Sequence, residues 1–263
     1  MGAVFMGWQT QLLFSIPTDP AVLGFLFSGT LCSYNFHWFL SLPDSEKRSP
    51  KINFTDNNRK LHLILTLLGL AGSAFFSIVL WDKVFLLLST AVFTFLYSAP
   101  KIPLKAFSFL KRIAIGKTIF LSAAWTQVTA VLPFLMEEKP VDAFAILYFI
   151  NRFFFIYSIC ILFDFRDRIE DKQQNIRSLI TILDEKGINR LYWFSLGTFY
   201  LTLVALFPVF SLLDILFLAL PAIPLALMYG YFKKNTSDYN YYFILDGLMI
   251  LSAPLLVFAK FAR

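Results

Sequence analysis

The chain has 263 residues, of which 58% are hydrophobic and only 15% are charged, and it contains 32 phenylalanines. Its mean hydropathy is +0.67. A soluble globular domain does not need this much apolar surface, so the composition excludes that class and indicates a membrane protein.

Nine apolar stretches have roughly the length of a membrane-spanning helix, since a hydrocarbon core about 30 Å thick takes roughly 20 helical residues. In chain order they cover residues 3–17, 21–42, 61–81, 84–99, 113–136, 141–163, 191–213, 214–232 and 240–260. The first stretch lacks a basic n-region and a cleavage site, so we interpret it as a retained helix. We therefore expect an all-α, polytopic membrane helical bundle of about nine transmembrane helices, forming a single domain over residues 1–263.

The basic residues predict an orientation for this bundle. If the nine spans alternate, the segments on one side hold 17 of the 23 Lys and Arg residues. By the positive-inside rule that side is cytoplasmic, with the N-terminus inside and the C-terminus outside. We expect the inner (cytoplasmic) membrane of a bacterium. The net charge of +6 then reflects orientation, and no nucleic-acid partner is expected.

Neither the cysteines nor the histidines indicate a site. Cys32 and Cys160 fall inside predicted helices, where we expect them to pack as small apolar side chains. His37 and His62 have no acidic or cysteine neighbours at ligand spacing, so we interpret them as ordinary interface residues.

The stretch ILFDFRDRIEDKQQN, residues 161–175, places acids directly after an apolar run. Asp164, Asp167 and Asp171 are spaced i, i+3 and i+7, so they project to one side of a helix. Two carboxylates one turn apart repel by roughly 3 kcal/mol at an effective dielectric near 20. A cation removes this repulsion, and Mg²⁺ is commonly shared between one or two carboxylates and a substrate phosphate. In the alternative interpretation, the acids form a solvated run paired with Arg166, Arg168 and Lys172.

Several segments resemble the UbiA prenyltransferase superfamily in the same order along the chain. DFRDRIEDKQQNIRSLITILDEKG resembles its second aspartate-rich motif, D-x-x-D-x-x-x-D. Weaker likenesses cover YSAPKIPLK (97–105), AAWTQVTAVLP (123–133) and YYFILDGLMIL (241–251). The resemblance implies a fold of nine helices and Mg²⁺ held by Asp164, Asp167 and Asp171 against the diphosphate of a polyprenyl donor.

The first motif of the family, N-x-x-x-D-x-x-x-D, is degenerate in this chain. Its segment reads SYNFHWFLSLPDSEKR, in which Asn35 aligns with the asparagine but Phe39 and Pro43 occupy the aspartate positions. Asp44 lies one residue further on. Asn35 remains a candidate oxygen ligand, whereas Phe39 and Pro43 offer no ligand oxygen.

Basic residues near the fourth and fifth spans are candidate diphosphate contacts. The resemblance favours Lys105, and Arg112 lies in the same loop, where orientation alone also explains positive charge. Lys117 falls inside the fifth span and either snorkels to the headgroups or contacts phosphate. Asn151 and Arg152, near the middle of the sixth span, are expected to face the bundle interior, apart from the acids.

Three functions follow from these observations. The first is a Mg²⁺-dependent transferase that moves a prenyl group from a polyprenyl diphosphate to a small or lipid acceptor, with Asp164, Asp167 and Asp171 as catalytic metal ligands. The second is a non-catalytic membrane subunit or binding protein of the same fold, because half of the metal site is missing. The third is a terpene cyclase on the same scaffold.

Overall fold

The computed structural model describes residues 1–40, 58–98, 117–173 and 178–261, and these residues contain helices and no strand. They fall into two compact units. The first consists of Met1 and residues 19–110, and the second of residues 2–18 and 111–263. Each unit is considered by itself below. The prediction of a single domain over the whole chain stays a prediction.

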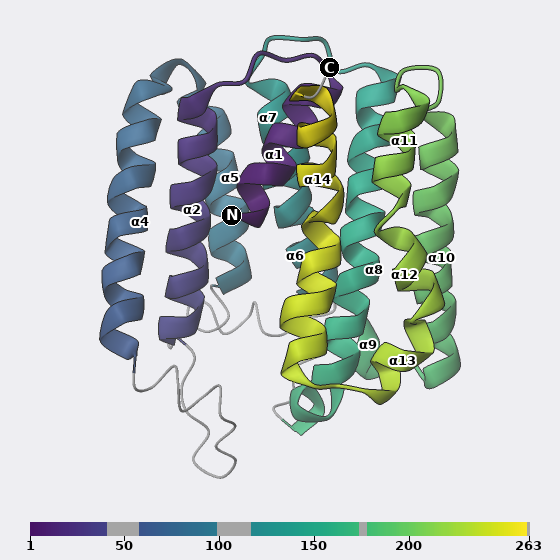
Figure 1. Cartoon of the computed structure of the whole chain (residues 1–263). Coiled ribbons are helices and arrows are strands. Elements are labelled where there is room, and N and C mark those ends of the chain that lie inside the picture. The colour runs from purple at the N-terminus through teal and green to yellow at the C-terminus, as the bar shows by residue number, and fades with distance from the viewer. Residues whose placement is uncertain (41–57, 99–116, 174–177, 262–263) are drawn as a thin grey trace. The chain divides into compact units, whose positions relative to one another are not determined.

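The first unit is a group of three long helices (Figure 1). They are α2 (Pro20–Leu40), α4 (Arg59–Val79) and α5 (Val84–Ser98), and the 3₁₀ turn η1 (Trp81–Lys83) joins the last two. Helices α2 and α4 lie side by side along their length. Small residues line their interface, which is how membrane helices approach each other without a hydrophobic driving force.

At Gly69 the backbones of α4 and α2 approach each other closely. A Cβ atom added at Gly69 would lie 2.5 Å from the backbone nitrogen of Cys32 and 2.8 Å from the carbonyl oxygen of Ser28. Both are backbone atoms, so a side chain at this position has no room unless the helices separate. The glycine therefore sets the spacing of the pair.

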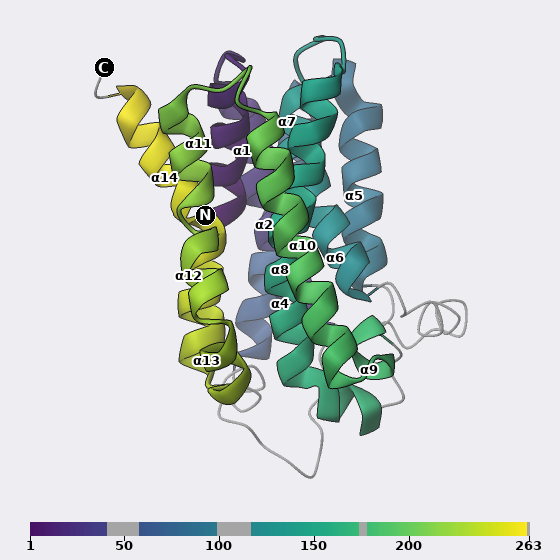
Figure 2. The same cartoon turned by 90° about the vertical axis from the view of Figure 1, so that its right-hand side faces the viewer.

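The second unit is built around α8 (Ala143–Gln173), which has 31 residues (Figure 2). It packs against α6 (Lys117–Thr126) and α10 (Glu185–Ala205). The N-terminal α1 (Gly2–Leu13) packs against α14 (Asp246–Phe261) in the same unit. The remaining elements are the π-helix η5 (Gln127–Val131), α7 (Leu132–Leu135), α9 (Leu179–Ile182), α11 (Leu212–Ala219), α12 (Ala222–Leu227), α13 (Tyr229–Lys234) and the π-helix η6 (Asn240–Leu245).

Side chains of α8 form the centre of the core in this unit. Ile156, Ile159 and Ile161 are almost fully buried there, and they belong to one cluster with Tyr192 and Phe199 of α10. Burying such side chains contributes about 1.5–3 kcal/mol each. The apolar run of α8 is thus held rigidly, and this positions the charged turns at its C-terminal end.

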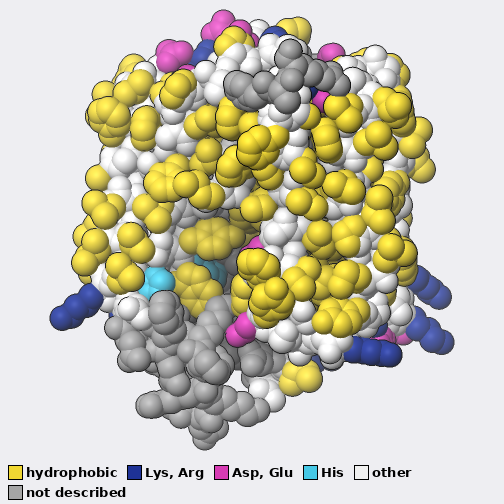
Figure 3. Space-filling view, viewed as in Figure 1, with side chains coloured by type: hydrophobic (Ala, Val, Ile, Leu, Met, Phe, Trp, Pro, Cys, Tyr) yellow, Lys and Arg dark blue, Asp and Glu magenta, His cyan; other side chains and the backbone are white. Residues whose placement is uncertain are grey.

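Four helical segments in the described part of the chain are long and apolar enough to cross a membrane. They are Arg59–Val79, Thr118–Leu135, Ala143–Ile169 and Asn240–Lys260. Only 11% of the first segment is buried, and most of its leucines are exposed, as lipid-facing side chains would be. In the face shown in Figure 3, hydrophobic side chains lie along the helices and most charged side chains lie near helix ends. The count of nine spans stays a prediction.

One helix extends beyond its apolar stretch, and one predicted span is divided. The helix that contains the apolar stretch 141–163 continues to Gln173, so the three aspartates are helical, as their spacing argument requires. The single helix predicted over residues 214–232 is instead divided into α11, α12 and α13. Pro221, which lacks a backbone N–H, lies at the first division.

Candidate functional site

The C-terminal turns of α8 carry the three aspartates predicted as metal ligands. Asp164 and Asp171 are both only 6% exposed, whereas the Asp167 side chain is 36% exposed. The two buried carboxylates are seven residues apart, which is two helical turns or roughly 10 Å along the axis. Asp164 and Asp171 share one side of α8, whereas Asp167, which the spacing places on that side as well, is partly exposed to solvent.

Asp164 receives a hydrogen bond from a neighbouring helix. The hydroxyl of Thr118, itself 1% exposed at the start of α6, donates to Asp164 Oδ2. Sequence reasoning did not identify Thr118, although it directly follows Lys117 in the GKT triplet. A hydrogen bond to a charged group fixes the carboxylate rotamer, so Thr118 orients Asp164 in the interior of the unit.

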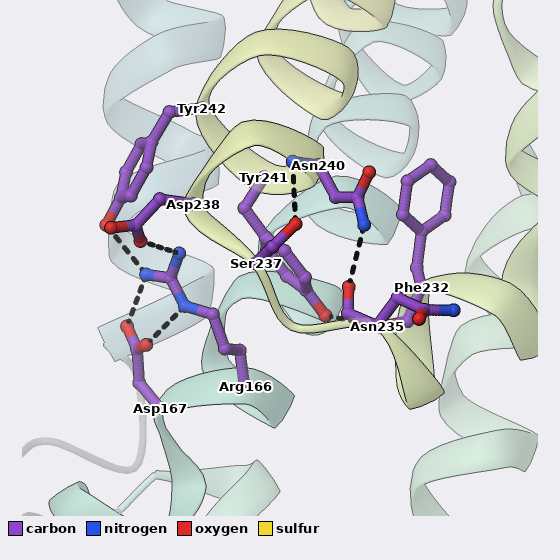
Figure 4. Close-up of polar contacts among 9 residues, drawn as sticks. All are labelled: Arg166, Asp167, Phe232, Asn235, Ser237, Asp238, Asn240, Tyr241 and Tyr242. Carbon is purple, nitrogen blue, oxygen red and sulfur yellow. Dashed lines mark hydrogen bonds and ion pairs between the residues drawn. The ribbon is translucent and has the colours of Figure 1, made fainter.

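Asp167 is paired with the arginine that precedes it, as the alternative interpretation of the acids proposes. Arg166 Nε donates to Asp167 Oδ1 at 2.7 Å, and Arg166 NH2 donates to the Tyr242 hydroxyl at 2.7 Å (Figure 4). Arg166 NH1 also lies 3.7 Å from Asp238 Oδ1. The guanidinium therefore connects Asp167 to the chain around the start of η6.

Three aromatic rings surround the same guanidinium. Its carbon lies 5.4 Å from the ring centroid of Phe163, 4.8 Å from that of Tyr241 and 4.7 Å from that of Tyr242. A cation over aromatic faces is stabilised by about 0.5–2 kcal/mol, depending on its desolvation. Arg166 is thus held by rings as well as by acids, and it keeps α8 against the C-terminal helix.

Other cations at this end of the unit have structural contacts. Arg168 donates to the carbonyl oxygen of Leu183 at 2.6 Å. Lys233 on α13 donates to Glu185 at 2.6 Å, and this hydrogen bond and the ammonium charge lower the pKa of the Glu185 carboxyl. These contacts connect α8 and α13 to the start of α10.

Asn35, the remaining residue of the degenerate first motif, belongs to the first unit. Its side-chain amide donates to the Leu31 carbonyl at 2.8 Å, and its Oδ1 lies 2.8 Å from His62 Nδ1 on α4. Phe39, one helical turn on, lies under the guanidinium of Arg59 at 5.0 Å. His62 thus fixes the orientation of Asn35, a contact for which the sequence gives no spacing signal.

Lys105, Arg112, Pro43 and Asp44 lie outside the described residues, and so does the side chain of Lys117, although its backbone begins α6. Among the described residues, no group of three or more His, Cys, Asp or Glu side chains converges as a metal cage.

These observations define the class of protein as an all-helical integral membrane protein with carboxylates at the end of one long helix. A comparison with protein families then identifies the family. The chain belongs to the UbiA prenyltransferase family, which matches it over residues 57–243. This match confirms the resemblance found in the sequence, and it begins after the degenerate first motif. No curated protein and no solved structure matches the chain.

Proposed function

We propose that the protein transfers a prenyl group from a polyprenyl diphosphate to a small or lipid acceptor within the membrane. In this reaction the bond between the prenyl carbon and the diphosphate oxygen breaks, and its electron pair leaves with the diphosphate. The acceptor forms a bond to the prenyl carbon and releases a proton. Membership of a prenyltransferase family supports the reaction type.

The observation that carries this proposal is the pair of buried carboxylates, Asp164 and Asp171, at the end of a candidate membrane span. Two full charges roughly 10 Å apart repel by about 1.7 kcal/mol at an effective dielectric near 20. Burial adds a desolvation cost to each charge. A cation bound at this end of α8 would offset both terms.

Mg²⁺ is the cation we propose. It prefers hard oxygen ligands and keeps several waters, so one or two carboxylates and a substrate diphosphate are enough to hold it. Asp164 and Asp171 supply such oxygens, with Asp167 as a further donor at the solvent side. When bound, the ion stabilises the negative charge that develops on the departing diphosphate.

The chain's own residues prepare this site. Thr118 holds the carboxylate of Asp164 in one orientation, and Arg166 neutralises Asp167. Lys105, Arg112 and Lys117 remain proposed diphosphate contacts, and Asn35 remains a proposed oxygen ligand. We further propose that the acidic end of α8 faces the cytoplasm of a bacterium, because the basic residues concentrate in the segments assigned to that side.

The experiment is isothermal titration of the purified protein with a farnesyl thiodiphosphate analogue, with and without Mg²⁺. We expect Mg²⁺ to strengthen binding in the natural protein, and Asp164→Asn and Asp171→Asn to lose this increment. Asp82→Asn is the matched control, since the Asp82 side chain is 72% exposed in η1. Binding of the analogue that does not depend on Mg²⁺ contradicts the assignment. A Mg²⁺-dependent increment that both variants retain contradicts it as well. Turnover of farnesyl diphosphate should likewise disappear in each Asp→Ala variant of the three aspartates.

A second function is favoured by one specific contact. Phe39 stands where the family has an aspartate, and it packs against Arg59 instead of offering an oxygen. A chain that has replaced this position by an apolar contact fits a non-catalytic membrane subunit that kept the fold. The same titration separates the two functions, because a subunit without the reaction should show no Mg²⁺-dependent binding of the analogue.

A further inference from the structure

One face of α10 is exposed from its first turn to its last and changes from basic to apolar. Lys186 and Arg190 are exposed near its start. Phe194, Leu201 and Val204 follow and are largely exposed as well. At 100° per residue these five positions, which form the outer stripe of α10, fall within about 80° of one another on the helix. The buried residues of α10 lie on its opposite face, against the core.

The two cations of the outer stripe carry charges that no described acid balances. No ion pair or hydrogen bond within the described ranges includes the side chain of Lys186 or Arg190. The acids beside them have other contacts, because Asp184 accepts from the helix backbone at 2.7 Å and Glu185 accepts from Lys233 at 2.6 Å. Like charges four residues apart on a helix repel each other. An anion bound between Lys186 and Arg190 would remove this repulsion.

These cations lie at the level where the apolar part of the second unit ends. Asn151 of α8 donates to Thr202 of α10 at 3.0 Å, and Arg168 donates at 2.6 Å to the carbonyl just before α10, so the two helices run antiparallel. Arg190 is twelve residues before Thr202, which places it level with the turn of α8 that precedes Asp164. In Figure 3, Lys and Arg side chains project at the lower right, where Figure 1 shows this end of α10. The outer stripe therefore carries its charges at the boundary of the hydrocarbon layer, where phospholipid phosphates lie.

Two residues beside the charges suit the neck and the acyl chain of a lipid. Trp193 follows the cations by one turn, and its ring centroid lies 5.6 Å from that of Tyr229 on α13, which fixes its orientation. Tryptophan favours the membrane interface, because its ring is apolar and its indole N–H can donate to a phosphate or ester oxygen. Gly197 follows by another turn, and a Cβ atom there would meet nothing within 4 Å. The backbone of α10 is thus open at this point, with room for an acyl chain between Phe194 and Leu201.

We propose that the outer stripe of α10 binds an anionic phospholipid of the surrounding bilayer. Its phosphate contacts Lys186 and Arg190, and one acyl chain lies along Phe194, Leu201 and Val204. A free phosphate would use only the basic end of the stripe, and a zwitterionic lipid would bring its own cation towards two positive charges. An anionic lipid matches both ends of the stripe. The site is on the outside of the second unit and does not depend on prenyl transfer.

The test is a titration of the purified protein in detergent, followed by native mass spectrometry. The two probes are phosphatidylglycerol and phosphatidylcholine with the same acyl chains. Each cation near an anionic headgroup strengthens binding about fivefold, so we expect the natural protein to bind its first phosphatidylglycerol about ten- to thirtyfold more tightly than its first phosphatidylcholine. Equal affinities for the two lipids would overturn the proposal.

Two double variants locate the preference. Lys186→Gln combined with Arg190→Gln removes both charges at exposed positions, so this variant should fold and should lose the preference for phosphatidylglycerol. Lys60→Gln combined with Lys172→Gln is the matched control, because it removes two exposed charges from α4 and α8. We expect the control to keep the preference of the natural protein. A preference that survives in the α10 variant, or one that is lost equally in the control, would refute the assignment to this stripe.

The fluorescence of Trp193 locates the acyl chain. The protein is reconstituted in phosphatidylcholine vesicles with a minor fraction of phosphatidylglycerol, and the same fraction of either lipid carries bromine on its chains. The contribution of Trp193 is the difference between the natural protein and Trp193→Phe. We expect brominated phosphatidylglycerol to quench Trp193 more strongly than brominated phosphatidylcholine, and the α10 double variant to abolish this difference. Equal quenching in the natural protein would refute the site, and a lack of quenching by either lipid would refute it in favour of a protein surface that covers the stripe.

Discussion

Replacing Gly69 by alanine tests the close packing of α2 and α4. The new Cβ would lie 2.5 Å from the Cys32 nitrogen and 2.8 Å from the Ser28 carbonyl oxygen. Real Cβ atoms do not come so close to backbone atoms, so the helices must separate. Overpacking of this kind costs about 1–3 kcal/mol. It should also disturb the Asn35–His62 hydrogen bond, which lies across the same interface at 2.8 Å.

Gly197→Ala is the matched control for this substitution. Gly197 lies within α10, and a Cβ atom there would meet nothing within 4 Å. Both substitutions improve helix propensity by up to about 1 kcal/mol, so this term cancels in the comparison. The remaining difference in unfolding free energy between the two variants should be about 1–3 kcal/mol, with Gly69→Ala the less stable.

The assay is reversible unfolding in mixed micelles by titration with a denaturing detergent, followed by circular dichroism. A further substitution distinguishes a clash with a side chain from a clash with the backbone. Gly72→Ala meets the side chain of Ser28, with Oγ at 2.5 Å, so Ser28→Gly should rescue it. The same change should not rescue Gly69→Ala, because its contacts are with the backbone. Equal stability of Gly69→Ala and Gly197→Ala, or rescue of Gly69→Ala by Ser28→Gly, would refute the reasoning.

Three further predictions concern the second unit. Thr118→Val removes the hydrogen bond to Asp164 and should weaken Mg²⁺-dependent binding of the thiodiphosphate analogue about two- to tenfold, while Thr198→Val in α10 should leave it unchanged in the same titration. Arg166→Gln releases the Tyr242 hydroxyl and should speed hydrogen–deuterium exchange over residues 238–245; unaltered exchange there would show that Arg166 does not hold this segment. Lys233 lowers the pKa of Glu185 in the folded protein below its ordinary value of 4.5. This contact therefore stabilises the fold fully above pH 4.5, and the stabilisation is lost as the pH falls through the lower pKa that Glu185 has in the folded state. The stability difference between the natural protein and Glu185→Gln, measured by thermal unfolding, should therefore disappear in acid, and a difference that persists there would contradict the ion pair.

The membrane class, the helical fold and the family could be predicted from the sequence. These properties depend on local composition and on motifs that stand close together in the chain, such as the apolar run of α8 and the aspartates that follow it. The shared side of Asp164 and Asp171 was also predictable, because it follows from helical periodicity. The interior position of Arg152 followed from the cost of a charge in lipid.

Only the tertiary structure decided which partners these residues have. Thr118 and Asp164 are 46 residues apart, and Arg166 and Tyr242 are 76 residues apart. No local pattern specifies such pairs, because they depend on which helices pack together and on their rotation. The structure therefore separates the three aspartates by exposure into two buried carboxylates and one partly exposed carboxylate, a distinction that their regular spacing conceals. It likewise showed that Arg152 has neutral partners, since the charge of a neighbour from another helix is set by packing and not by sequence distance.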